Sequence, residues 1–141
     1  MYISAMKEDN TMEENKELYE LREYIENKLL GLGFKPERKD WSLSSKSYHL
    51  KDELQRIKEE KYDYYYISGN NLYVTEVYRS NGTKANISYR IEIMEWNHSS
   101  GHALEVVKIS YKDSKKKQER LLNEIINHYM EMVNSKENAN G

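Results

Sequence analysis

Residues 62–111 read YDYYYISGNNLYVTEVYRSNGTKANISYRIEIMEWNHSSGHALEVVKISY, and they predict a β-sheet. Tyrosine, isoleucine and valine, which favour strands, fill four runs that polar turn residues separate. The runs are YDYYYI (62–67), LYVTEVYR (72–79), ISYRIEIMEW (87–96) and ALEVVKISY (103–111). Because consecutive strands usually lie side by side, we expect a four-stranded antiparallel meander.

The clearest turn signal is Asn81-Gly82, with alternating apolar residues on both sides. A type I′ turn needs positive φ at both central positions, and Asn-Gly meets that need. A two-residue loop here would pair Ser80 with Thr83 and Val74 with Tyr89. The Ser-Gly-Asn-Asn cluster at 68–71 predicts a second turn of the same meander.

These two turns set the register, and side-chain alternation then divides the sheet into two faces. The core face is expected to carry Tyr65, Ile67, Leu72, Val74, Tyr78, Ile87, Tyr89, Ile91, Ile93, Val107, Ile109 and Tyr111. The second face is expected to carry Tyr62, Tyr64, Tyr66, Tyr73, Thr75, Val77, Arg79, Ser88, Arg90, Glu92, Met94, Trp96, Lys108 and Ser110. Leu104 and Val106 break the alternation, which predicts a β-bulge near Val106.

Three helices are expected around the sheet. Thr11 and Glu14 form a capping box that predicts a first helix, ending at the glycines near residue 31. The helical spacing of Leu50, Leu54 and Ile57 predicts a second helix over residues 48–60. A long final helix, capped by residue 113 or 114, carries a broad apolar arc over residues 121–133 and should lie across the sheet.

The predicted architecture is therefore α+β, in the order α-α-β-β-β-β-α, with the C-terminal helix packed on the sheet. One domain is expected over residues 11–133, between flexible tails at 1–10 and 134–141. Met1, Met6 and Met12 all remain candidates for the native start. Four strands span about 20 Å, which accommodates about two helices. Whether a helix covers the second face is therefore left open.

Composition excludes several classes of protein. The 141 residues carry a net charge of −2 although 33% are charged, which excludes a strongly basic nucleic-acid binder and an acidic DNA mimic. There is no cysteine and no run of about 18 apolar residues, so we expect a cytoplasmic protein that does not bind membranes. The wealth of Tyr, Lys, Asn, Ile and Glu is typical of AT-rich coding sequences, as in low-GC bacteria, their phages and mobile elements.

The second face is the candidate binding surface, because tyrosine, tryptophan and arginine are enriched in binding hot spots. The predicted partner-binding residues are Tyr64, Tyr66, Tyr73, Arg79, Arg90, Trp96 and Lys108. A protein partner is the first expectation. Aromatic rings beside cations also suit RNA or single-stranded DNA. In a third interpretation, a helix or a second copy of the chain covers this face and the tyrosines are ordinary packing.

A second, weaker candidate is an anion site formed by Lys112, Lys115, Lys116 and Lys117. They lie at the start of the final helix, where the helix dipole disfavours cations and favours anions. The alternative is a solvated lysine run with no ligand.

Catalytic, metal and cofactor sites are not predicted. His98 and His102 are four residues apart, but Ser99, Ser100 and Gly101 between them indicate a loop without fixed geometry. Phosphate-binding loops and nucleophile elbows are absent from the sequence. The leading hypothesis is a small non-enzymatic inhibitor or adaptor from a low-GC bacterium, phage or mobile element; anti-defence inhibitors, including anti-CRISPR proteins, are one such class. A metal-independent nuclease ranks lowest.

Overall fold

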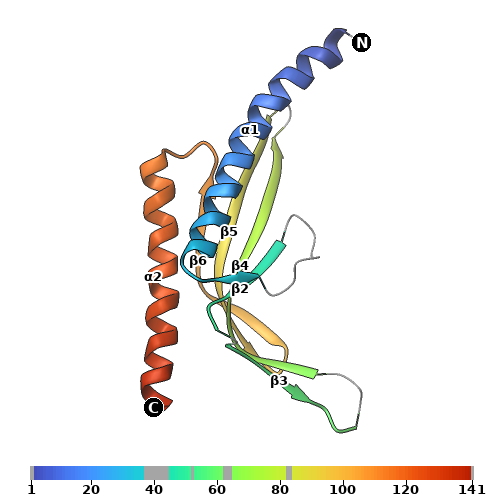
Figure 1. The fold of residues 1–141 in the computed structure, drawn as a ribbon. Helices are drawn as coiled ribbons and strands as arrows, with labels where there is room; N and C mark the ends of the chain where they lie inside the picture. Colours follow the sequence, from blue (N-terminus) through green and yellow to red (C-terminus); the bar gives the residue numbers. More distant parts are fainter. Residues whose placement is uncertain (1, 37–44, 52, 62–64, 82–83, 141) are drawn as a thin grey trace.

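The computed structural model describes the backbone of the chain except residues 1, 37–44, 52, 62–64, 82–83 and 141, and most side chains from residue 16 to residue 136 (Figure 1). This part of the chain forms two helices and a six-stranded antiparallel sheet, an α+β fold. The elements are α1 (Tyr2–Gly31), β1 (Lys35–Pro36), β2 (Ser45–His49), β3 (Leu54–Lys58), β4 (Tyr65–Asn81), β5 (Lys84–Asn97), β6 (Ser100–Ser110) and α2 (Lys115–Asn140).

The predicted helix over residues 48–60 is wrong, because this segment contributes the strands β2 and β3. Both pair with the same edge of β4: Tyr48 lies opposite Leu72, and Ile57 lies opposite Tyr66. A helix here would satisfy its own backbone hydrogen bonds but would bury only a thin apolar stripe. As strands, the segment pairs its backbone with β4 and buries Tyr48 and Leu54. The N-terminal helix is correct, although it begins at Tyr2 rather than at the capping box.

The predicted turn at residues 68–71 is also wrong, since β4 runs through it as one strand of 17 residues. Asn70 and Asn71 are buried, and the side chain of Asn70 donates a hydrogen bond to the carbonyl oxygen of Met94 at 3.2 Å. Gly69 has a φ of +124°, and a Cβ there would overlap the carbonyl oxygen of Glu53. Residues typical of turns are used here to let strands approach and to satisfy buried polar groups.

The β4–β5 hairpin exists, but its register differs from the prediction by two residues. Asn81 pairs with Lys84, and Val74 pairs with Ile91 rather than with Tyr89. Residues 82 and 83 lie outside the described part. A shift of one residue would exchange the two faces of a strand, whereas a shift of two preserves them. The core-face prediction for Leu72, Val74, Tyr89, Ile91 and Ile93 is therefore confirmed despite the register error.

The predicted β-bulge is present two residues earlier than expected. Ile93 pairs with Glu105 and Met94 pairs with Ala103, which leaves Leu104 as the additional residue on β6. Val106 lies opposite Glu92 and so belongs to the second face.

Both described helices pack on the core face. Figure 1 shows α1 crossing over the strands and α2 running along the sheet beside β6. The shared core consists of Leu21, Ile25, Leu29, Phe34, Tyr48, Leu72, Val74, Tyr89, Ile91, Ile93, Val107, Ile109, Leu122, Ile125, Ile126, Tyr129 and Val133. No described helix covers the second face. None of the described helices has the length and apolar character needed to cross a membrane.

Candidate binding face

The second face is built from rows of side chains that run across β4, β5 and β6. In one row, Thr75 lies opposite Arg90, which lies opposite Lys108. In the next row, Tyr73 lies opposite Glu92, which lies opposite Val106. Other described residues of this face are Asn71, Val77, Ser88, Met94, Trp96 and Ser110. The structure thus brings together Tyr73, Arg90 and Lys108, three of the predicted partner-binding residues.

Arg90 and Glu92 form an ion pair along β5. The Nε atom of Arg90 lies 2.9 Å from Oε1 of Glu92, although its N–H is not aligned for a hydrogen bond. The side chain of Arg90 is 42% exposed and that of Glu92 is 13% exposed. Lys108, in contrast, is exposed and forms no ion pair within the described residues. Of the two described cations on this face, Arg90 is therefore balanced by Glu92 and Lys108 is not.

Trp96 is held in place by two neighbours. Its indole N–H donates a hydrogen bond to the side-chain oxygen of Asn71 at 3.0 Å. Its ring lies over Gly101, where a Cβ would come within 2.6 Å of two ring carbons. Trp96 is half-buried. It therefore combines a structural role with a partly accessible aromatic edge.

The structure describes the other predicted residues only in part. Tyr66 lies opposite Ile57 of β3, and its predicted position on the second face stays a prediction. Its ring lies 5.3 Å from the ring of His98, between centroids. Tyr64 is outside the described residues. Arg79 pairs with Asn86 through the β4 backbone, and its side chain is outside the described part.

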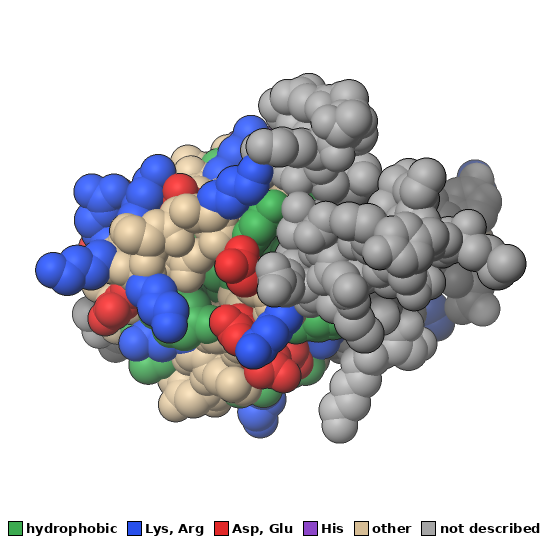
Figure 2. Space-filling model, turned by 90° about the horizontal axis from the view of Figure 1, so that it is seen from above, with side chains coloured by type: hydrophobic (Ala, Val, Ile, Leu, Met, Phe, Trp, Pro, Cys, Tyr) green, Lys and Arg blue, Asp and Glu red, His purple; other side chains and the backbone are tan. Residues whose placement is uncertain are grey.

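The four lysines of the weaker candidate make separate contacts. Lys112 places its ammonium 5.6 Å from the ring centroid of Tyr111, and Lys117 lies 3.3 Å from the carboxylate of Asp113. Lys115 and Lys116 are exposed. Seen from above, this end of the molecule carries basic side chains with acidic ones among them (Figure 2). Anion binding by this group stays a prediction.

The start of α2 has the predicted cap. The backbone N–H of Lys117 donates a hydrogen bond to the hydroxyl of Ser114 at 3.2 Å. The carboxylate of Asp113 accepts one from the backbone N–H of Ser110. Ser114 therefore caps the helix, while Asp113 joins it to the end of β6.

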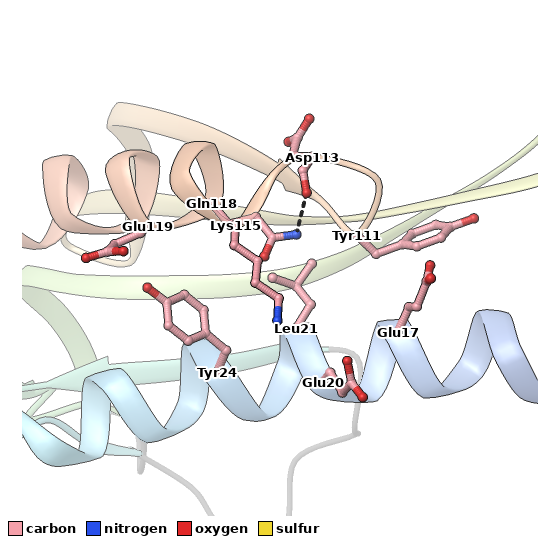
Figure 3. Close-up of a pocket in the computed structure, with 9 residues that line it drawn as sticks. All are labelled: Glu17, Glu20, Leu21, Tyr24, Tyr111, Asp113, Lys115, Gln118 and Glu119. Atoms are coloured by element: carbon pink, nitrogen blue, oxygen red, sulfur yellow. Dashed lines mark hydrogen bonds between the residues drawn. The ribbon is translucent and has the colours of Figure 1, made fainter.

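A hollow of about 580 Å³ lies between α1 and the start of α2 (Figure 3). Its lining residues are Glu17, Glu20, Leu21, Tyr24, Tyr111, Asp113, Lys115, Gln118 and Glu119. Figure 3 shows the side chain of Lys115 pointing from α2 toward α1. Burial, and then the charge of Glu119, raises the pKa of Tyr24. No local sequence pattern predicts this hollow, because its two walls are about ninety positions apart in the chain.

Two of the described histidines, His102 and His128, each lie beside a single carboxylate. Nδ1 of His128 lies 2.6 Å from both carboxylate oxygens of Glu105, and Nε2 of His102 lies 3.5 Å from Oε1 of Glu95. Within the described residues, no group of three or more His, Cys, Asp or Glu side chains is placed to hold a metal ion.

No protein-family model, curated protein or solved structure matches the chain. Its fold and its candidate site define it as a two-layer α+β protein in which the described helices share one sheet face.

Proposed function

We propose that this chain is a small non-enzymatic protein that binds another protein through its second face and acts as an inhibitor or adaptor. The observation that supports this function is the position of both described helices on the core face. It leaves Tyr73, Arg90, Val106 and Lys108 on a face that no described helix covers. Tyrosine and arginine are the residue types that most often anchor protein interfaces.

The balance of charge favours a protein partner over a nucleic acid. Nucleic-acid binding draws most of its affinity from cations that neutralise phosphates. On the second face Arg90 is already paired with Glu92, and the neighbouring Val77, Met94 and Val106 are apolar. RNA or single-stranded DNA on the same face is the alternative, and Lys108 is the described residue that supports it.

The small size, the balanced charge and the composition support a cytoplasmic protein of a low-GC bacterium, phage or mobile element. Inhibitors of a defence system, such as anti-CRISPR proteins, are one class with these properties. The partner would then be a component of that system.

A pull-down with the tagged full chain from a low-GC bacterial lysate tests this function. It is run with and without nuclease, at low salt and at about 0.5 M salt, where exposed charges are screened. We expect a discrete protein that survives both nuclease and salt. If nucleic acid is recovered at low salt but not at high salt, the result would favour RNA or DNA binding over a protein partner. Recovery of neither would contradict both.

A further inference from the structure

The outer edge of β6 is a second feature of the same binding region. β6 is the last strand of the sheet in the order β1-β2-β4-β5-β6, and no described strand pairs with its outer side. An unpaired edge presents rows of backbone N–H and C=O groups that another chain can pair with.

Ser110 shows which residues of β6 direct their backbone outward. Its N–H donates to the carboxylate of Asp113 at 3.0 Å, and its carbonyl oxygen accepts from the side-chain amide of Gln118 at 3.1 Å. Both groups of Ser110 therefore point away from β5. In an antiparallel ladder the backbone N–H and C=O groups of successive residues point alternately to the two sides of the strand. The backbone groups of Val106 and Lys108 therefore also point outward, away from β5.

The exposure of the residues along β6 alternates with the same period of two. Val107 is 9% exposed and Ile109 is fully buried, because their side chains lie on the core face opposite Ile91 and Tyr89. Val106 is 38% exposed and Lys108 is exposed. Within the described residues, the backbone groups of Val106 and Lys108 make no hydrogen bond on the outer side. These amides and carbonyls are available to a partner.

The side chains beside these groups indicate the chemistry of the partner. Val106 is apolar, while Lys108 is a cation that has Arg90 opposite it in the same row. A strand added to β6 would place its second-face side chains next to these residues, and cross-strand pairs prefer opposite charges and matched apolar groups. We infer that the outer edge of β6 binds an extended segment of a protein partner, with an apolar residue beside Val106 and an acidic residue beside Lys108.

The same edge discriminates against other strands. The bulge at Leu104 interrupts regular pairing, and an exposed edge lysine repels basic segments and disfavours apolar ones. For an acidic segment, the same lysine is attractive, because its ammonium can pair with a carboxylate of the added strand. The edge is thus limited to a short stretch between the bulge and Ser110. This inference rests on the proposed function and assigns the partner's binding segment.

A phage-displayed random peptide library selected on the full chain tests the edge directly. Lys108→Pro removes one outward N–H without removing a bond to β5, a position at which an edge strand tolerates proline. Lys16→Ala is the control for the loss of one positive charge, because Lys16 is exposed on α1 and far along the chain from β6. We expect peptides that alternate apolar and acidic residues. They should bind the wild type and Lys16→Ala alike, and Lys108→Pro about tenfold more weakly.

Lys108→Glu keeps the N–H and reverses the charge, so it provides the same test if the proline variant does not fold. The inference is overturned if no such peptides are selected, or if they bind both Lys108 variants as tightly as the wild type. It is also overturned if the wild type is a dimer by light scattering and Lys108→Pro is a monomer, because the occupant is then a second copy.

The failure of this inference can be distinguished from failure of the proposed function. A protein partner that Lys108→Pro retains and Tyr73→Ala loses would leave the second face as the binding surface and exclude the edge. A partner that both variants retain would exclude both.

Discussion

The indole N–H of Trp96 donates a hydrogen bond to the side-chain oxygen of Asn71 at 3.0 Å, across the strands β5 and β4. Asn71 is only 3% exposed, so this bond satisfies a buried polar atom. The neighbouring Asn70 is also hydrogen-bonded, on the core side of the sheet. Its side-chain amide donates to the carbonyl oxygen of Met94, and its side-chain oxygen accepts from the ammonium of Lys136. Two asparagines in the middle of a strand thus connect it to its surroundings on both faces.

Replacing Trp96 by phenylalanine should destabilise the fold. Trp96→Phe keeps an aromatic ring over Gly101 but leaves the buried oxygen of Asn71 without its donor. We expect the free energy of unfolding to fall by about 1–3 kcal/mol. Urea denaturation followed by circular dichroism measures the change, with Tyr19→Phe as the exposed control. An unfolding midpoint equal to that of the wild type would show that the bond contributes nothing.

Gly69→Ala should be costly for a backbone reason. Alanine would have to adopt the positive φ of Gly69, which is strained for a residue with a Cβ. The new Cβ would also overlap the carbonyl oxygen of Glu53, so the start of β3 would have to move. We expect a loss of about 1–3 kcal/mol in unfolding free energy. Gly31→Ala is the matched control, since a Cβ there meets no atom within 4 Å. Equal stability of the two variants would contradict the close approach of β3 to β4.

The contact between His128 and Glu105 should make stability depend on pH. The hydrogen bond to Glu105, and then the charge of that carboxylate, raises the pKa of His128 above its ordinary value of 6.5, and Glu131 and Glu124 raise it further. A raised folded pKa gives stability that is fully present below the unfolded pKa. That stability is lost as pH rises through the folded value.

Thermal unfolding of the wild type and of His128→Gln measures this contribution. The difference in melting temperature should be largest near about pH 5.5 and should shrink by about pH 9. His49→Gln serves as a control on a different element. A difference that stays constant, or grows with pH, would rule out the ion pair as its source.

The sequence predicts the two layers of the fold better than its connections. Side-chain alternation identifies Leu72, Val74 and Ile91 as core residues whatever the exact register, because a slip of two residues changes no face. The broad apolar arc likewise predicts the burial of α2. These are repeating patterns, and each is spread over many residues.

The errors arise where distant residues override a local signal. Asn70 and Asn71 read as a turn, but Met94 and Trp96 satisfy them inside a strand. The apolar residues of segment 48–60 have helical spacing, yet the segment pairs with the edge of β4 and forms strands instead. The prediction of the candidate site depends on the correct and the wrong parts of the fold prediction alike. Tyr73, Arg90 and Lys108 lie together because the faces of β4, β5 and β6 were predicted correctly, whereas the position of Tyr66 was inferred from a turn that does not exist.

The second face is proposed to bind a protein partner. The most direct test measures how tightly the captured partner binds to variants of this face. Tyr73→Ala and Arg90→Ala are compared with the wild type and with Tyr19→Ala, whose side chain is exposed on α1. Circular dichroism first confirms that each variant is folded. We predict that either face variant weakens binding by at least about tenfold, and that Tyr19→Ala has no effect. Undiminished binding by both folded face variants would contradict the claim.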